Sequence, residues 1–269
     1  MGLFDKLLGR KTNRSDAVDA EIAAMVKDGR MHARMRLHDD TVATLTLPSH
    51  LIGRVVDISY GGIAVSFVGA KSPVQEGAQF EGSLKILGAS TALLVTAVRV
   101  VAYQGDATMV GFCLHHQAAG GLLFLRDFIE PSRCGQSLAL IAPELRQARY
   151  QGSEWHCWRG DGPTDLIAQT QPGTGVLSEA ILTFRLNKTY CELTFKGGVL
   201  QVGIIRQEDE SSLLNGTARA MASNVDDEVR VLRAGLYILL ASPAPCRALS
   251  APMIALARAR LLLPAGGAV

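Results

Sequence analysis

Short runs of alternating apolar and polar residues between residues 43 and 115 constrain the fold of this chain most strongly. In the clearest run, Phe80, Leu84 and Ile86 alternate with polar residues. A period of two places successive side chains on opposite faces of a strand. Further strands are expected at 43–47, 51–58, 63–68, 91–103 and 107–115, between turn signals such as Pro48-Ser49, Gly61-Gly62 and Gly105-Asp106. Six short strands without a long helix between them predict a closed antiparallel barrel or a sandwich.

The remainder of the chain alternates less regularly. A helix is predicted at 119–130, ended by Pro131, and a connecting helix at 138–150. Five strands are then expected at 154–159, 165–170, 180–186, 190–195 and 200–206, followed by helices at about 224–241 and 251–263. The predicted fold is therefore mainly β, with a six-stranded antiparallel barrel followed by a smaller α+β domain. The expected divisions are an N-terminal helical segment (1–27), the barrel (28–130), a connecting helix or linker (131–152) and the C-terminal domain (153–269).

Composition narrows the class of protein. The 269 residues suffice for two domains, and 48% of them are hydrophobic. A net charge of +2 argues against a general DNA or RNA binder, which would carry a strong basic excess. The five cysteines are scattered without a C-x-x-C pair, which predicts free thiols and no metal site. No secretory signal and no apolar run of about 20 residues is found, so we expect a cytoplasmic protein. Residues 2–9 form an amphipathic stretch, interpreted as a terminus packed on the protein or a weak membrane contact.

Two short motifs carry the chemistry. The first is Arg30-Met-His-Ala-Arg34, and the second is Asp57-Ile-Ser59-Tyr-Gly-Gly62. Each is weak alone, because arginines four residues apart and such turns are common. Together they bracket one or two strands, and the second lies at a strand end of the predicted barrel. Their pairing therefore indicates a common binding site.

The residue types in these motifs suit a particular ligand chemistry. The planar guanidinium groups of Arg30 and Arg34 match phosphate oxygens and stack on flat bases. Asp57 can accept hydrogen bonds from the ring N–H and amino group of a guanine, and Ser59 can add a hydroxyl contact. Gly61 and Gly62 permit positive φ and a close backbone approach. A ligand with two phosphates and two guanines would use all these groups.

With these motifs, and with Val110-Gly111-Phe112 in the last predicted barrel strand, residues 28–130 resemble the bacterial PilZ domains. The resemblance implies a six-stranded barrel that binds cyclic di-GMP. It implies that Arg30 and Arg34 grip phosphates and stack on guanine, and that Asp57, Ser59 and Gly62 surround a guanine. Arg36 and Gly61 are possible additional contacts, although for Arg36 the interpretation as a solvated surface charge is favoured. Gly29 departs from the bulky or charged residue of many relatives, which leaves open whether one ligand molecule or a stacked pair binds.

Other candidates are weaker. The segment Trp155-His156-Cys157-Trp158 is interpreted as core or a partner-facing surface with both indoles on one face, and Cys113 as a core residue. No nucleophile elbow or phosphate-binding glycine loop is present, so catalysis is not expected. The predicted function is a second-messenger receptor without a cofactor, in which the nucleotide reorients the N-terminal segment and the C-terminal domain to regulate a protein partner. The alternative is a PilZ-like scaffold that binds no nucleotide.

Overall fold

The computed structural model describes residues 34–38, 43–69, 74–103, 105–115, 119–187, 189–205, 220–221 and 225–262. The predicted N-terminal helical segment and Arg30 lie outside the described residues. The chain divides into two compact units. The described part of the first comprises residues 34–36, Thr44–Leu84 and Thr91–Arg126, and the second consists mainly of residues from Asp127 onward.

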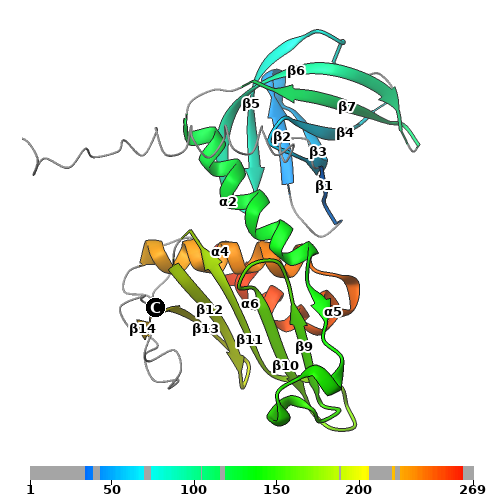
Figure 1. Ribbon diagram of the computed structural model, residues 1–269. Helices are drawn as coiled ribbons and strands as arrows, with labels where there is room; N and C mark the ends of the chain where they lie inside the picture. Colours follow the sequence, from blue (N-terminus) through cyan, green and yellow to red (C-terminus); the bar gives the residue numbers. More distant parts are fainter. Residues whose placement is uncertain are drawn as a thin grey trace, which may run out of the picture. The chain divides into compact units, whose positions relative to one another are not determined.

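The first unit is built around a closed antiparallel barrel (Figure 1). Its strands are β2 (Ala43–Leu47), β3 (Leu51–Ile58), β4 (Gly62–Val68), β5 (Gln79–Ile86), β6 (Ala89–Ala102) and β7 (Ala107–Leu114). They follow the order β3-β2-β5-β6-β7-β4, and pairing of β3 with β4 closes the ring. The two-residue strand β1 (Met35–Arg36) adds to β3, and a 3-10 turn, η2 (Pro48–His50), joins β2 to β3. The predicted six-stranded barrel is confirmed.

The alternation in the sequence fills the barrel. Ala43, Leu45 and Leu47 of β2 are buried while the residues between them are not, and β5 buries Leu84 and Ile86 in the same way. The edges of Phe67 and Phe112 meet inside, with ring centroids 6.4 Å apart. Because one face of each strand is buried, a one-residue slip would expose the apolar side chains, and this fixes the register.

Helix α2 (Ala119–Gln136) follows the barrel and does not end at Pro131, so the predicted helix end is wrong. Proline removes one helical hydrogen bond and costs about 3 kcal/mol or more in a helix interior. Packing of the last turns offsets this cost, since Phe128 meets the ring of Tyr237 edge-on with centroids 4.8 Å apart. The hydroxyl of Ser132 also donates to the carbonyl oxygen of Phe128 at 2.8 Å.

The second unit contains an antiparallel sheet in which the strands follow chain order. Its strands are β8 (Ala139–Leu140), β9 (Trp155–Arg159), β10 (Asp165–Thr170), β11 (Leu177–Leu186), β12 (Thr189–Lys196), β13 (Val199–Ile205) and β14 (Ala220–Met221). The predicted hairpin turns occur between β11 and β12, where Asn187 has φ 58°, and between β12 and β13, where Gly197 and Gly198 have φ 57° and 79°. The described strands and helices of this unit confirm the predicted α+β arrangement.

Three helices complete the second unit: α4 (Val225–Ala241), α5 (Ala244–Leu249) and α6 (Ala251–Leu262). Helix α4 packs on β11, β12 and β13, and α6 packs on α4 and β13. Leu182, Leu193 and Val202 are buried on the covered face of the sheet. Arg260 of α6 pairs with Glu228 of α4 and donates to the carbonyl oxygen of Leu200 at 2.8 Å, which links the helices to the sheet.

The connecting helix predicted at 138–150 is wrong. The segment forms β8 and two 3-10 turns, η3 (Pro143–Leu145) and η4 (Ala148–Tyr150). Arg146 explains this path, because its guanidinium donates to the carbonyl oxygens of Ile141 and Trp155 at 2.9 and 2.6 Å. These two bonds form only when the backbone of the segment is looped, and the helical period in the sequence does not reveal them.

The two indoles of β9 lie on opposite faces of the sheet, so the prediction of one shared face is wrong. Trp158 is the register partner of Leu166 and stacks on His156, while Trp155 pairs with Gln169 and meets the ring of Tyr150. Residues three apart in a strand point to opposite sides. Within the described ranges, no helix is both long enough and apolar enough to cross a bilayer.

Candidate functional site

The two sequence motifs meet on the outside of the barrel. Arg34 directly precedes β1, and the pairing of β1 with β3 makes Arg36 and Asp57 register partners. The Nη1 atom of Arg34 donates to Oδ1 of Asp57 at 2.8 Å. The two side chains are 53% and 25% exposed, so both reach solvent. The structure therefore places Arg34 of the first motif beside Asp57 of the second, with Arg36 next to them.

The turn after Asp57 is closed by Ser59. Its amide donates to the carbonyl oxygen of Gly62 at 2.8 Å, and its hydroxyl lies 3.1 Å from both the amide nitrogen and the carbonyl oxygen of Gly62. Ser59 is only 3% exposed. In this structure the hydroxyl therefore shapes the turn, and a contact from Ser59 to a ligand remains a prediction.

Gly62 is needed for close approach between strands. A Cβ atom there would lie 2.6 Å from the carbonyl oxygen of Phe112 and 3.8 Å from Nη2 of Arg34. The second distance also shows that the guanidinium of Arg34 lies over the outer side of Gly62. Neither Gly61 nor Gly62 has positive φ, so that part of the prediction is wrong. The close approach seen at Gly62 is to the neighbouring strand, and a close approach of a ligand to this backbone stays a prediction.

A row of small residues continues from Asp57 across the barrel surface. Asp57 is the register partner of Ala64, Ala64 of Gly111, and Gly111 of Arg99. Directly opposite residues in antiparallel strands share a face. The neighbouring row runs from Gly62 through Cys113 to Thr96. We call the four small residues Gly62, Ala64, Gly111 and Cys113 the outer floor.

Cys113 belongs to this floor and not to the barrel core, so its predicted core position is wrong. Phe112 and Leu114 on either side of it are buried, whereas Cys113 is only partly buried. Period-two alternation alone did not decide which of these residues faces inward. Of the floor, the sequence reasoning placed only Gly62 at the site, because the pairing of β4 with β7 joins residues far apart in the chain.

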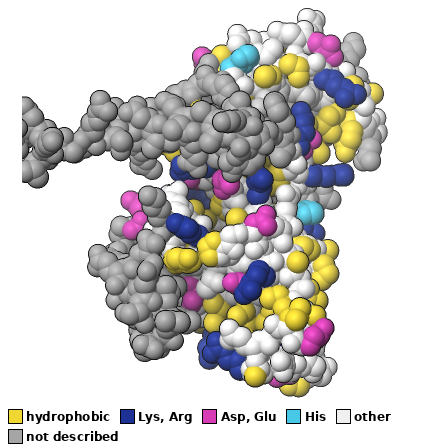
Figure 2. Space-filling view, in the orientation of Figure 1, with side chains coloured by type: hydrophobic (Ala, Val, Ile, Leu, Met, Phe, Trp, Pro, Cys, Tyr) yellow, Lys and Arg dark blue, Asp and Glu magenta, His cyan; other side chains and the backbone are white. Residues whose placement is uncertain are grey.

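The charged side chains at the outer floor form a small local group. Figure 2 shows basic and acidic side chains interspersed among the described residues of the visible face, in keeping with a net charge of +2. At the outer floor, Arg34, Arg36 and Arg99 supply cations and Asp57 the carboxylate. This arrangement can bind a phosphate and a hydrogen-bond donor of a base side by side.

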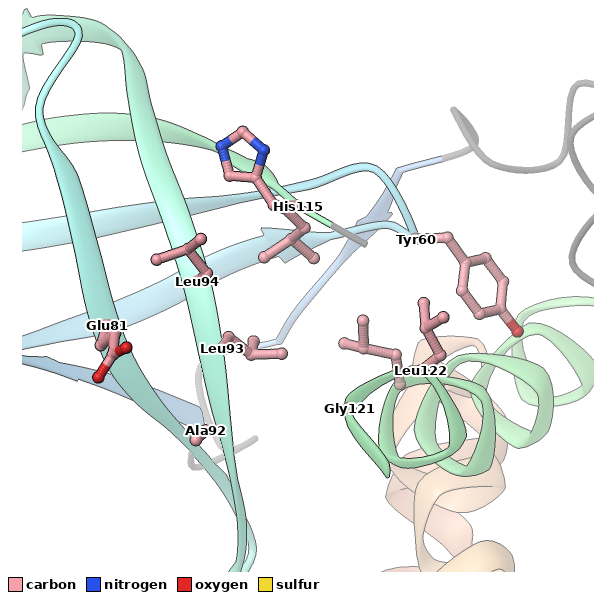
Figure 3. Close-up of a pocket in the computed structure, with 10 residues that line it drawn as sticks. Tyr60, Glu81, Ala92, Leu93, Leu94, His115, Gly121 and Leu122 are labelled. Carbon is pink, nitrogen blue, oxygen red and sulfur yellow. The ribbon is translucent and has the colours of Figure 1, made fainter. Parts of the chain in front are cut away.

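A separate pocket lies inside the first unit, beneath α2 (Figure 3). Its volume is about 230 Å³, and its walls are mainly leucines of β6, β7 and α2, namely Leu93, Leu94, Leu114, Leu122 and Leu125. Tyr60, from the motif turn, lines this pocket and is buried. The Asp57–Gly62 turn thus has one side that faces the outer floor and another, carrying Tyr60, that packs toward α2.

The second unit has an apolar groove of about 710 Å³ between β9, β10 and the α5–α6 turn. Among the described residues that line it, His156 is the one titratable side chain, beside Trp158, Val176 and Pro252. Burial and the nearby Arg146 lower the pKa of His156 below its ordinary value. No group of three metal-binding side chains occurs among the described residues, and His115 instead bonds to the hydroxyl of Thr96. The described lining of the groove therefore offers mainly apolar contact.

Comparison with known proteins gives a distant structural likeness. No family model matches the chain, and no curated protein matches it. The crystal structure of the Borreliella burgdorferi PlzA protein in complex with c-di-GMP is similar over 81% of this chain and 99% of that one, at 13% identity and a TM-score of 0.31. The barrel and the geometry of its outer floor, described above, support the proposal that follows.

Proposed function

We propose that this chain is a PilZ-like receptor for cyclic di-GMP, which binds on the outer floor of the barrel. The observation that carries the proposal is the direct contact between Arg34 and Asp57 beside Gly62. It supports the proposal because Arg34, suited to phosphate, and Asp57, suited to guanine, come from two separate motifs and lie at one place. Arg30, four residues before Arg34, is proposed to close over the ligand from the preceding segment.

The contact between Arg34 and Asp57 has to open or shift when a nucleotide arrives. Exposed ion pairs contribute only about 0–1 kcal/mol, so opening this one costs little. A phosphate oxygen gains charge-assisted hydrogen bonds from Arg34 and Arg36, worth about 1.5–3 kcal/mol each. Asp57, once released, accepts from the N1–H and N2 amino group of a guanine. An adenine offers no such pair of donors, so this contact favours guanine.

The small residues of the outer floor suit a flat ligand. Ala64 and Gly111 place no large side chain above the strands, and Gly111 is partly exposed. A planar base can therefore approach the backbone closely. Ser59 holds the turn that orients Asp57 and Gly62, and Gly61 anchors it by accepting from the amide of Leu114 at 3.0 Å.

The receptor is proposed to act through other parts of the chain. Binding would reorient the N-terminal segment and the C-terminal unit, and the latter would contact a regulated protein partner in the cytoplasm. The nucleotide can shift this equilibrium only by its differential affinity for the two arrangements. The apolar lining of the groove in the second unit favours this binding role over catalysis.

One observation favours the alternative of a scaffold that binds no nucleotide. Asp57 already has a partner in Arg34, and the hydroxyl of Ser59 is already bonded within its turn. These polar groups are satisfied without a ligand. Such a barrel would serve only as a platform for protein contacts.

A thermal-shift measurement on the full chain separates the two functions. A ligand at about 100 times its dissociation constant stabilises a protein by about 2.7 kcal/mol. We expect cyclic di-GMP to raise the unfolding temperature, and GMP at the same concentration to raise it much less. An unfolding temperature unchanged up to millimolar cyclic di-GMP would favour the scaffold.

A further inference from the structure

Arg99 lies at the far end of the row that begins at Asp57. It is the register partner of Gly111 on β7. The Cβ of Arg99 lies 3.6 Å from the position that a Cβ on Gly111 would occupy. The side chain of Val98 is also near, at 4.0 Å from the same point. Arg99 therefore rises from the edge of the outer floor, on the same face as Gly111.

Two irregularities of the barrel flank this row. The register of β3 shifts between Val55 and Asp57, and the register of β6 shifts between Ala97 and Arg99. Bulges are common next to binding sites because they redirect a side chain. Here one bulge precedes Asp57 and the other precedes Arg99, and both residues lie in the same row.

The backbone that carries Arg99 is well supported. The carboxylate of Glu76 accepts from the amide of Val100 at 2.9 Å, and the amide of Gly77 donates to the carbonyl oxygen of Ala97 at 2.7 Å. The side chain of Arg99 is exposed, and within the described ranges it makes no hydrogen bond or ion pair. A fixed backbone with an uncommitted guanidinium is suited to ligand contact.

The span of the row matches a ligand with two bases. Asp57 and Arg99 stand on β3 and β6, with β4 and β7 between them. Three steps between neighbouring strands cover about 14 Å along the surface. A cyclic dinucleotide carries its two bases on opposite sides of a phosphate ring, so one base held at Asp57 directs the other across the floor.

We propose that Arg99 binds the second guanine of the dinucleotide, donating from its planar fork to O6 and N7. This inference rests on the proposed function and deepens it, because it adds a second specificity contact on β6. Arginine paired with O6 and N7 of guanine discriminates strongly against adenine, which presents an amino donor in place of O6. Asp57 and Arg99 would then read one guanine each.

Cyclic GMP–AMP, in which one guanine of the ligand is replaced by adenine, provides the test. Its guanine takes the Asp57 position, and its adenine then faces Arg99. By isothermal titration we expect the wild-type chain to bind cyclic di-GMP about tenfold more tightly than cyclic GMP–AMP. In Arg99→Ala, cyclic di-GMP should bind about tenfold more weakly while cyclic GMP–AMP changes less than about threefold, so the preference disappears.

Two further variants sharpen the result. Arg99→Lys keeps the charge but loses the fork, and should retain only part of the preference. Lys85→Ala removes an exposed cation from β5 and should leave both affinities as in the wild type. Equal weakening of both ligands in Arg99→Ala, or no weakening of either, would overturn the assignment of Arg99 while leaving the receptor intact. A wild-type chain that binds neither nucleotide would instead overturn the proposed function.

Discussion

Gly62 and Gly111 differ in what surrounds them, although both belong to the outer floor. A Cβ on Gly62 would lie 2.6 Å from the backbone oxygen of Phe112, whereas a Cβ on Gly111 would meet Arg99 at an ordinary 3.6 Å. The first contact cannot be relieved by a side-chain rotation, because it involves backbone. The two glycines therefore have different roles: Gly62 allows two strands to approach, and Gly111 keeps the surface low.

The first prediction compares these two residues. Gly62→Ala should lower the free energy of unfolding by about 1–3 kcal/mol, since β4 and β7 must separate to admit the methyl group. Gly111→Ala should change it by less than about 0.5 kcal/mol. Urea unfolding followed by circular dichroism measures both. Equal stability of the two variants would show that the strands are not as close as Gly62 indicates.

The second prediction concerns the floor as a ligand surface. Gly111→Leu places a large side chain outward, above the strands, where a Cβ would make only ordinary van der Waals contacts with Val98 and Arg99. We expect a folded protein whose affinity for cyclic di-GMP falls at least about tenfold, because a base can no longer lie against the floor. Isothermal titration with cyclic di-GMP measures the affinity, and thermal unfolding checks that the variant keeps the unfolding temperature of the wild type. Wild-type affinity in Gly111→Leu would place the ligand elsewhere.

At the scale of elements, helix α2 depends on a glycine for its packing. A Cβ on Gly135 would lie 2.1 Å from the carbonyl oxygen of Ile238 in α4, whereas a Cβ on Gly120 would meet nothing within 4 Å among the described residues. Both glycines belong to the same helix. The same glycine-to-alanine change at the two positions therefore differs in whether the added methyl group meets another helix.

The third prediction follows from that pair. Alanine stabilises a helix by about 1 kcal/mol relative to glycine, so Gly120→Ala should raise stability modestly. In Gly135→Ala the same gain is outweighed, because α2 and α4 must move apart, and we expect a net loss of about 1–3 kcal/mol. Thermal unfolding monitored by circular dichroism distinguishes the two. A stabilised Gly135→Ala would mean that the two helices are not in close contact there.

The strands of this protein could be predicted from the local alternation of apolar and polar residues, whereas some other elements could not. Alternation such as that of Phe80–Ile86 predicts strands because burial of one face follows directly from period two. The continuation of α2 through Pro131 depends on Phe128 meeting Tyr237, which lies more than 100 residues away. The looped path of 138–150 depends on bonds from Arg146 to the carbonyl oxygens of Ile141 and Trp155, which the helical period does not reveal.

The site was predictable to a similar degree. Arg34, Asp57 and Gly62 are visible in the sequence because each belongs to a short motif, and the structure brings them together. Ala64 and Arg99 carry no local signal. Their places beside Asp57 arise from strand pairing and from two bulges, which a single sequence does not reveal.

At the scale of the whole molecule, buried thiols link stability to pH. Burial raises the pKa of Cys191 and of Cys246 from an ordinary value of 9.0 to about 11 in each case. Burial also raises the pKa of the Tyr237 hydroxyl. All three groups belong to the second unit. The folded protein therefore holds protons that the unfolded chain releases at lower pH.

The fourth prediction gives the sign of this linkage. The stabilisation that the two protonated thiols contribute is fully present below about pH 9 and is lost as pH rises toward 11. The reason is that the thiols of the unfolded chain ionise at a lower pH than those of the folded protein. The free energy of unfolding should fall between pH 8.5 and pH 11, and fall less in Cys246→Ala. Urea unfolding across this range measures it. A fall of equal size in the variant would show that Cys246 does not contribute.

Isothermal titration of the full chain with cyclic di-GMP, in the wild type and in Arg34→Ala, tests the central claim most directly. The control is Arg159→Ala, which removes the arginine of an exposed Arg–Asp pair of the same 2.8 Å length in the second unit. We expect saturable binding by the wild type and by Arg159→Ala, and binding at least about tenfold weaker in Arg34→Ala, because a charge-assisted contact to phosphate is lost. No binding by the wild type, or equal affinity in all three proteins, would contradict the proposal that the outer floor is a nucleotide receptor.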